Sequence, residues 1–139
     1  MVVVAEAHTA AGRSKADIVR ETFARWSAGD RELRTEDIDP DAEVISQLAN
    51  QVFRGYEGIR RWVCDVLDSF DEWSMEICQT RETELGRLLV IGRAKLRGRE
   101  SGVDLDVPCA WLFDFSHGRM RRMEIFLNRV EDAEAAARI

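Results

Sequence analysis

Few side chains in this sequence have the types and spacing that metal or thiol chemistry needs. The three cysteines, Cys64, Cys78 and Cys109, lie far apart in apolar surroundings without a C-x-x-C pair, and the chain has two histidines. Zinc sites and disulfide frameworks require such residues in close, repeated spacing. We therefore expect no metal and no cofactor, and we interpret the cysteines as small core residues.

The acidic residues that could transfer protons fall on polar faces of the predicted elements. They are Asp65, Asp68, Asp104, Asp106 and Asp114. The first two lie off the apolar stripe of a predicted helix, and the other three alternate with apolar residues of a predicted strand, which favours solvated surface over catalysis. His117 precedes Gly118 in a predicted hairpin turn, where an exposed imidazole is the ordinary case.

The orientation of Arg93 is ambiguous from the sequence. Alternation that starts at Leu88 directs its side chain outward, whereas a bulge at Gly92 would turn it inward. An inward guanidinium would bind a carboxylate, phenolate or enolate. We favour the outward orientation, because Arg93 and the basic residues that follow it could then pair with Glu124 on the neighbouring strand.

The elements that position these side chains follow a short N-terminal arm. The chain is 45% hydrophobic and 33% charged, as expected for a globular protein, and we place one domain at residues 14–139 after an arm at 1–13. Ser14 and Asp17 form a capping-box pattern at the start of a first helix that ends at Gly29. A short strand at about 42–47 and a loop at 48–55 precede a second helix, whose apolar stripe runs from Ile59 to Phe70.

From Trp73 onward the hydrophobic period changes to two, which indicates half-buried antiparallel strands. The last strand covers 119–128 and is followed by a short helix at 129–137, with Asn128 as its N-cap. Helices followed by a run of meandering strands predict an α+β fold in which the helices pack on one face of the sheet.

The charge of the chain argues against nucleic-acid binding. The net charge is −6 and the pI is near 5.0, whereas phosphate backbones are bound by clustered Lys and Arg. The opening Met-Val-Val-Val-Ala run is too short for a signal peptide, and there is no apolar run near 18 residues. We expect a cytoplasmic protein that does not bind membranes.

Six sequence segments carry a resemblance that covers about residues 16–137. They are Trp-Ser-Ala-Gly-Asp at 26–30, Asp-Pro-Asp-Ala-Glu at 39–43, Phe-Arg-Gly-Tyr-Glu-Gly-Ile-Arg-Arg-Trp at 53–62, Ser-Gly-Val-Asp at 101–104, and Gly-Arg-Met at 118–120 running into Ala-Glu-Ala-Ala at 133–136. In this order the chain resembles the nuclear transport factor 2-like superfamily, in particular its SnoaL-like branch of polyketide cyclase relatives. The resemblance implies a cone-shaped fold, with a strongly curved antiparallel sheet packed on about three helices around an apolar pocket.

The resemblance does not bring the family's proton-transfer residues with it. At the positions of the ketosteroid isomerase Tyr, base Asp and second acid, this chain has Thr22, Ser46 and Trp111. At the His and Asp of SnoaL-type cyclases it has Trp111 and Ile125. Of the Asp-Arg-Asp set of limonene-epoxide hydrolases, only the Arg is matched, at Arg93. The resemblance supports none of these three reactions.

The predicted pocket is therefore aromatic and apolar, with neutral polar groups. We expect its ligand-binding residues to be Thr22, Trp26, Ser46, Trp62, Trp111 and Ile125. Each tryptophan alone is better explained as core packing, but three that converge on one cavity favour a flat apolar ligand. If the protein is an enzyme, Arg93 and Ser46 are the plausible participants.

An apolar strip on the opposite face of the sheet predicts a homodimer interface. It consists of Leu89, Ile91, Leu112 and Phe126. Two functions stay open at this point. The first is a cofactor-free, dimeric protein that binds a small apolar or aromatic molecule, with isomerase, cyclase or dehydratase chemistry as the family's expectation. The second is a non-catalytic interaction or stability module. An inward charge and room for a ring would favour the enzyme, whereas a pocket filled by its own tryptophans would favour the module.

Overall fold

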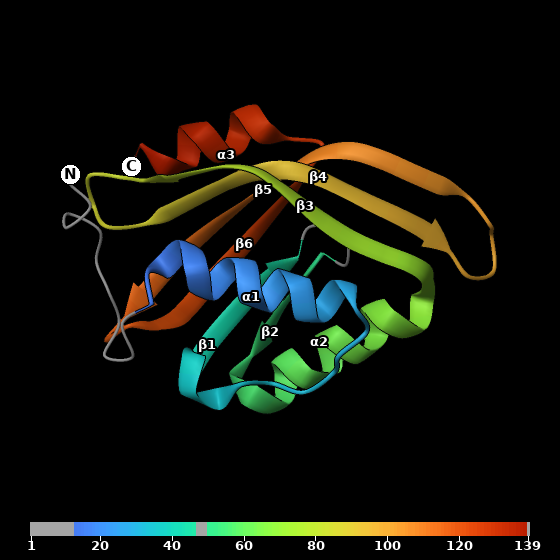
Figure 1. Ribbon diagram of the computed structural model, residues 1–139, viewed down its shortest axis with the longest axis horizontal. Coiled ribbons are helices and arrows are strands. Elements are labelled where there is room, and N and C mark those ends of the chain that lie inside the picture. The colour runs from blue at the N-terminus through green and yellow to red at the C-terminus, as the bar shows by residue number, and fades with distance from the viewer. Residues whose placement is uncertain (1–12, 47–49, 139) are drawn as a thin grey trace.

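The computed structural model describes residues 13–46 and 50–138, which form three α-helices and one six-stranded sheet (Figure 1). The elements are α1 (Lys15–Ser27), the 3-10 turn η2 (Thr35–Asp37), β1 (Ile38–Ser46), β2 (Gln51–Arg54), α2 (Gly55–Ser69), β3 (Phe70–Glu82), β4 (Leu88–Gly98), β5 (Asp104–Ser116), β6 (Arg119–Leu127) and α3 (Val130–Ala137). The α+β class predicted from the sequence is confirmed.

Helix α1 begins where the capping box was expected. The Ser14 hydroxyl accepts a hydrogen bond from the Asp17 N–H at 3.1 Å, and the Asp17 carboxylate accepts one from the Ser14 N–H at 3.3 Å. Arg13, the last residue of the expected N-terminal arm, contacts Glu21 and the buried Asp37. Residues 1–12 of that arm lie outside the described residues, as does Gln47, the last residue of the short strand expected at about 42–47.

The strand order is β2-β1-β6-β5-β4-β3. All neighbouring pairs are antiparallel except β1 and β6, which run parallel, so the sheet is mixed and the prediction of an antiparallel sheet was wrong in this respect. The helix α2 and the strands β3 to β5 separate β1 from β6 in the chain, which provides the long connection that a parallel pair needs. Part of the loop predicted at 48–55 is the strand β2, which pairs with the end of β1. The strong conical curvature stays a prediction.

The three helices cover both faces of the sheet. Along β4, β5 and β6 the side chains of Val90, Trp111 and Met123 belong to the core beneath α1 and α2. The adjacent residues Leu89 and Leu112 point to the other face, where α3 covers them. The helices were expected on one face, and the placement of α3 corrects this (Figure 1). The expected Asn128 cap is also wrong, because the N-cap is Arg129 and Asn128 has a left-handed backbone with φ of 57°.

Helix α3 covers the strip that was expected to form a dimer interface. Leu89, Leu112 and Phe126 are 0%, 1% and 4% exposed, and they pack with Ala133 and Ala137 of α3. Ile91 is partly buried against the same cluster. The prediction that this strip joins two copies of the chain was wrong, because the chain's own alanine-rich helix already removes the strip from water.

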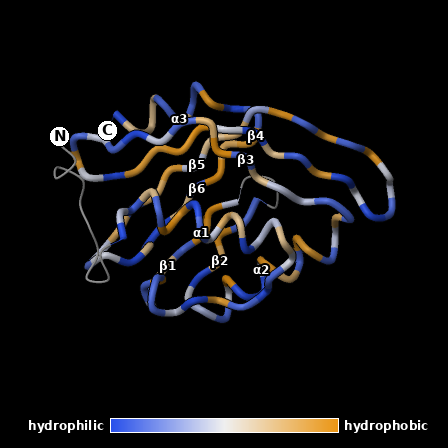
Figure 2. Tube along the Cα trace, in the orientation of Figure 1, coloured by the Kyte–Doolittle hydropathy of each residue, from blue (hydrophilic) through white to orange (hydrophobic). Residues whose placement is uncertain are grey.

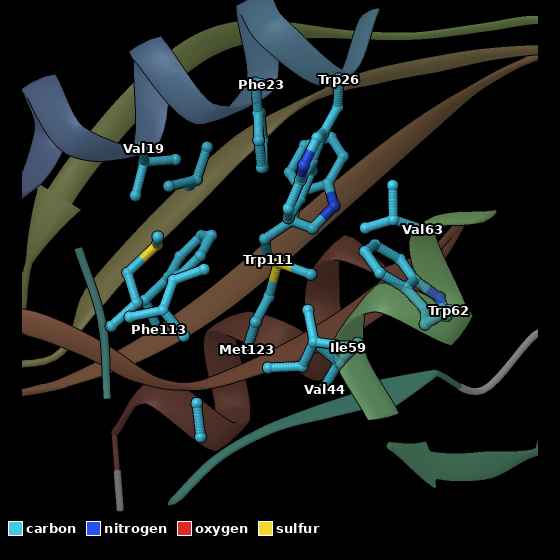
Figure 3. Packing of buried hydrophobic residues seen from close by; sticks show 14 of the residues in the cluster. Val19, Phe23, Trp26, Val44, Ile59, Trp62, Val63, Trp111, Phe113 and Met123 are labelled. Atoms are coloured by element: carbon cyan, nitrogen blue, oxygen red, sulfur yellow. The ribbon is translucent and has the colours of Figure 1, made fainter. Parts of the chain in front are cut away.

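The main core lies between the sheet and the pair α1 and α2 (Figure 3). Figure 2 shows hydrophobic residues concentrated along the central strands, whereas the tip of the β4–β5 hairpin is hydrophilic. Phe23 and Trp26 project from α1 toward Trp111 on β5, and Trp62 and Val63 approach from α2. This side of the sheet therefore contains the aromatic residues that were expected at a ligand site.

A bulge in β3 determines which way β4 directs its side chains. Ile77 pairs with Gly92 and Gln79 with Ile91, so Cys78 is the extra residue and the bulge lies opposite Gly92, not within β4. The alternation of β4 consequently continues without interruption. It places Ala94 and Leu96 toward the core and leaves Arg93 on the other face, as the sequence favoured.

Candidate functional site

An apolar cavity lies between the C-terminal half of α2 and the inner face of the sheet, and we call it the first cavity. Its volume is about 50 Å³. It is lined by Ser46, Trp62, Val66, Phe70, Trp73, Met75, Ala94, Leu96, Cys109, Trp111, Ile125 and Leu127. Five of the six strands and α2 therefore contribute to the wall, so the cavity depends on contacts between segments far apart in the chain.

The polar groups that line the first cavity are few and neutral. Among the described lining residues, none carries a carboxylate, imidazole, amine or guanidinium group. The hydroxyl of Ser46, which is 5% exposed, and the thiol of Cys109, which is 1% exposed, are the hydrogen-bonding side chains that accompany the indole groups. This wall can enclose an apolar surface, but it has no group that would exchange a proton with a substrate near neutral pH.

Burial governs the chemistry of Cys109. Removal from water raises the pKa of its thiol from 9.0 to about 12, and this outweighs the hydrogen bond to the Ala110 carbonyl, which acts in the opposite direction. Because the thiolate is the nucleophilic form of cysteine, Cys109 is an inert part of the wall. The expectation of buried cysteines holds for Cys109 but is wrong for Cys78, which the bulge in β3 leaves exposed.

The buried thiol predicts a loss of stability at alkaline pH. Above pH 9 the unfolded chain loses the Cys109 proton and the folded chain retains it, so the unfolded state binds fewer protons. The free energy of unfolding should fall with a slope of up to about 1.4 kcal/mol per pH unit between pH 9 and 12. Urea unfolding at pH 8 and pH 10 would measure this loss. It should be smaller in Cys109→Ala, whereas Cys78→Ala should retain it, and an equal loss in all three proteins would contradict the prediction.

Four tryptophans and a phenylalanine form one aromatic cluster around the cavity. The ring centroids of Trp26 and Trp62 are 5.4 Å apart, those of Trp62 and Trp73 are 5.8 Å apart, and those of Trp26 and Trp73 are 6.1 Å apart. Phe23 meets Trp111 edge to face at 4.9 Å. Such pairs add about 0.5–1.5 kcal/mol each beyond area burial. The rings therefore stabilise the fold, and three of them, Trp62, Trp73 and Trp111, also line the first cavity.

A second cavity of about 30 Å³ lies between β1, β6 and the end of α1. It is lined by Trp26, Ile38, Ala42, Glu43, Val44, Ile59, Phe113, Met120, Arg122 and Met123. Trp26 contacts two of the three tryptophans that line the first cavity, Trp62 and Trp73, and also lines the second one. The two cavities are therefore neighbours that share one aromatic cluster.

The structure brings four of the six expected ligand-binding residues together. Ser46, Trp62, Trp111 and Ile125 line the first cavity. Trp26 lines the second cavity instead. Thr22 lines neither, because it lies one turn earlier on α1, where its hydroxyl donates to the Ile18 carbonyl at 2.8 Å.

Arg93 lies outside the cavity, and its partner is not the one expected. Its Nε donates to the Asp106 carboxylate at 2.8 Å, and its side chain is 41% exposed. The next two basic residues, Lys95 and Arg97, contact Glu76 and Asp104 instead. The expected pairing with Glu124 is wrong, because β5 lies between β4 and β6 and supplies closer acids. An outward Arg93 cannot act on a ligand in the first cavity.

The outer wall of the first cavity consists of residues that the sequence patterns did not predict at the site. Trp73 and Met75 of β3, together with Val66 and Phe70 at the end of α2, are only partly buried and lie at the cavity. The alternation that begins at Trp73 contains a usable signal, because Trp73, Met75 and Ile77 lie two residues apart and so share one face of the strand. The alternation alone does not identify these residues as part of the cavity, because the pattern of an edge strand does not show which helix covers it.

The sequence also matches a family of known domains. Residues 19–123 match the model of the SnoaL-like domain. The chain belongs to the SnoaL-like domain family. A search of curated proteins found no match.

Solved structures with the same fold come from diverse sources. An NTF2-like protein of unknown function from Burkholderia pseudomallei has a TM-score of 0.72 and 15% identity, covering 86% of this chain and 94% of its own. A protein from Catenulispora acidiphila with a ketosteroid isomerase-like fold was solved with trimethylamine. It has a TM-score of 0.72 and 13% identity, and the match covers 79% of this chain and 84% of that protein. TerC, co-crystallised with polyporic acid, has a TM-score of 0.70 and 17% identity, and the match covers 86% of this chain and 95% of TerC. These identities establish the NTF2-like fold of the SnoaL-like chain and no shared activity.

Among the described residues, no helix is long and apolar enough to cross a membrane. No cluster of histidine, cysteine and acidic side chains suited to a metal ion is found in the same part of the chain.

Proposed function

We propose that this SnoaL-like domain binds a small, uncharged, apolar molecule in the first cavity and does not catalyse acid–base chemistry on it. The observation that carries the proposal is the lining of the cavity, in which aromatic and aliphatic side chains surround one hydroxyl and one protonated thiol. Solved relatives that hold trimethylamine and polyporic acid support small-molecule binding by this fold. The absence of a charged lining residue in the described part of the chain argues against an isomerase, cyclase or dehydratase that needs a carboxylate base.

The volume of the first cavity determines how such a molecule enters. About 50 Å³ is less than the roughly 150 Å³ of an engineered cavity that takes benzene. The inner wall, with Ala94 and Trp111, is fully buried in the sheet, whereas Trp73 on the edge strand is partly exposed. We infer that a single-ring ligand enters on the β3 side and displaces the Trp73 side chain.

The small volume also favours a second candidate, a non-catalytic stability or interaction module. In that case the tryptophans fill the cavity as core packing, and no ligand displaces them. The apolar strip under α3 is not available as its contact surface. The two candidates differ in whether a single-ring molecule binds to the folded chain.

Toluene, benzoate and a cavity-filling variant distinguish the two candidates. Ala94→Val adds two methyl groups to the inner wall and should fill the first cavity, while its β-branched side chain suits a strand. The control Arg93→Val changes the adjacent residue of the same strand on the opposite face. We expect toluene to raise the melting temperature and change the tryptophan fluorescence of the wild type and of Arg93→Val, but not of Ala94→Val. Benzoate should have no effect on any of them, because no lining cation meets its carboxylate.

If toluene changes neither the melting temperature nor the fluorescence of the wild type, the result would favour the stability or interaction module. An equal response of Ala94→Val and wild type would place the binding elsewhere. A response to benzoate would imply a cation at the site and would overturn the apolar description.

A further inference from the structure

An apolar patch lies beside the first cavity, on the inner face of the β4–β5 hairpin. It consists of Val103, Leu105 and Val107, and we call it the hairpin patch. Val103 and Leu105 are 57% and 41% exposed, and Val107 is half-buried. The Gly98 N–H donates to the Val103 carbonyl at 3.0 Å, so the pairing of the two strands continues as far as Val103. Because the three patch residues are two positions apart, their side chains share one face.

The hairpin patch continues the wall of the first cavity. Leu105 pairs with Leu96 across the β4–β5 ladder, and Val107 pairs with Ala94. Directly paired residues have side chains on the same face of the sheet, about 5 Å apart. Leu96 and Ala94 both line the first cavity. An apolar molecule that extends out of the cavity past Leu96 therefore lies against the patch.

The end of β6 explains why the patch is exposed. The ladder between β5 and β6 ends where Cys109 pairs with Leu127, so no described strand pairs with residues 104–107 of β5 on that side. Figure 1 shows the hairpin extending past the point where β6 ends and α3 begins. Side chains in this part of β5 therefore lack the lateral neighbours that bury Cys109 and Trp111.

The charges of the hairpin lie on its other face. Arg97 donates to the Asp104 carboxylate at 2.7 Å, and Arg93 donates to the Asp106 carboxylate at 2.8 Å. The two acids alternate with the patch residues along β5, and the two arginines alternate with Ala94 and Leu96 along β4. The hairpin patch therefore favours contact with an uncharged chain.

A ring that enters on the β3 side arrives next to this patch. Trp73 pairs with Leu96, and Leu96 pairs with Leu105, so the three side chains form one row across β3, β4 and β5. Neighbouring strands are about 4.8 Å apart. A ring that displaces the Trp73 side chain and lies over Leu96 is thus one strand away from Leu105, a distance that a chain of a few carbon atoms spans.

We propose that the hairpin patch binds the unbranched, uncharged alkyl chain of a ligand whose ring occupies the first cavity. The proposal rests on the function proposed above and narrows the ligand to an alkyl-substituted ring. The observation that carries it is the direct pairing of two patch residues with two residues of the cavity wall. The cavity volume of about 50 Å³ agrees with it, because a larger ligand must extend beyond that wall.

Three alkylbenzenes test the proposal through their dissociation constants, measured by titration of the tryptophan fluorescence. n-Butylbenzene should bind about eightfold more tightly than toluene. A fully buried methylene adds about fourfold in affinity and one covered on a single side about twofold, so three methylenes give about eightfold. tert-Butylbenzene has the same atoms gathered beside the ring, where they do not reach Leu105, and should bind no more tightly than toluene.

Two leucine variants locate the chain on the protein. Leu105→Ser should bind n-butylbenzene about as weakly as toluene. Leu85→Ser is the matched control, because Leu85 is 69% exposed in the β3–β4 turn and does not line the first cavity, so this variant should keep the eightfold preference. In the wild type, a nuclear Overhauser cross-peak should join the terminal methyl group of n-butylbenzene to the methyl groups of Leu105.

Failure of the proposed function and failure of this extension give different results. If the wild type binds none of the three compounds, the proposed function fails and the extension fails with it. If the wild type binds toluene but does not prefer n-butylbenzene to tert-butylbenzene, or if Leu105→Ser keeps that preference, only the extension is overturned.

Sedimentation of the ligand-free proteins tests a competing occupant of the hairpin patch. We expect Leu105→Ser to have the same oligomeric state as the wild type. A wild-type dimer that Leu105→Ser converts to a monomer would assign the patch to a second copy of the chain and would overturn the extension.

Discussion

Replacing Gly92 with alanine should unfold the protein or lower its free energy of unfolding by more than about 4 kcal/mol. A Cβ at this position would lie 1.8 Å from the Glu76 carbonyl oxygen and 2.9 Å from its carbon. Both atoms belong to the backbone of β3, which the pairing with β4 and the bulge at Cys78 hold in place. Relief of the clash requires β3 to move away from β4, and this would break the ladder on both sides of the bulge.

Gly98→Ala on the same strand is the matched control. There the added Cβ would meet the Ser101 hydroxyl at 2.4 Å, and that side chain can rotate away. We expect Gly98→Ala to lie within about 1 kcal/mol of the wild type in urea unfolding. If Gly92→Ala is recovered only as insoluble protein while Gly98→Ala is soluble, this result also agrees with the prediction. Equal stability of the two variants would contradict the prediction, because it would show that the β3 backbone at the bulge can shift away from the added Cβ at little cost.

Truncating Trp111 to alanine should lower the free energy of unfolding by about 3–5 kcal/mol and enlarge the first cavity. Trp111 is 2% exposed, packs on Phe23 and lies at the centre of the sheet on β5. Its removal leaves a space that the fully buried neighbours on the inner wall cannot fill by collapse. Exogenous indole should then bind in that space and recover part of the stability, by an amount that rises with its concentration.

Trp73→Ala separates this cavity effect from the general loss of an indole. Trp73 is in the same aromatic cluster but is partly exposed on an edge strand, so its truncation should cost less and open the first cavity toward solvent. Thermal unfolding with and without indole would compare the variants. If indole stabilises Trp111→Ala no more than Trp73→Ala, the space left by Trp111 has collapsed and the inner wall is not rigid.

Local patterns in the sequence were sufficient to predict most elements of the fold. The capping box at Ser14, the apolar stripe that begins at Ile59 and the period of two after Trp73 each depend on neighbours a few residues apart. Backbone hydrogen bonding and the helical or extended repeat act over that range, so the sequence records them directly. The quoted segments were also sufficient to identify the SnoaL-like family before any fold was seen.

Contacts between distant segments decided what the local patterns could not. The short strand β2 was missed because its four residues become a strand only by pairing with β1. The direction of Arg93 depended on where the bulge lies, and the bulge is in β3, thirteen or more residues away from its effect. The strip at Leu89 looked like an interface because a strand pattern shows which residues are apolar but not which element covers them.

The sequence by itself determined the class of the fold, its family and the apolar character of the inner sheet face, because residue type and periodicity encode these locally. The tertiary structure alone decided that α3 closes the outer strip, that Trp26 and Trp111 belong to different cavities, and that the first cavity is small and free of charge among the described residues. The physical reason is that a cavity is the space left between packed elements, and its size depends on how side chains from five strands and two helices meet.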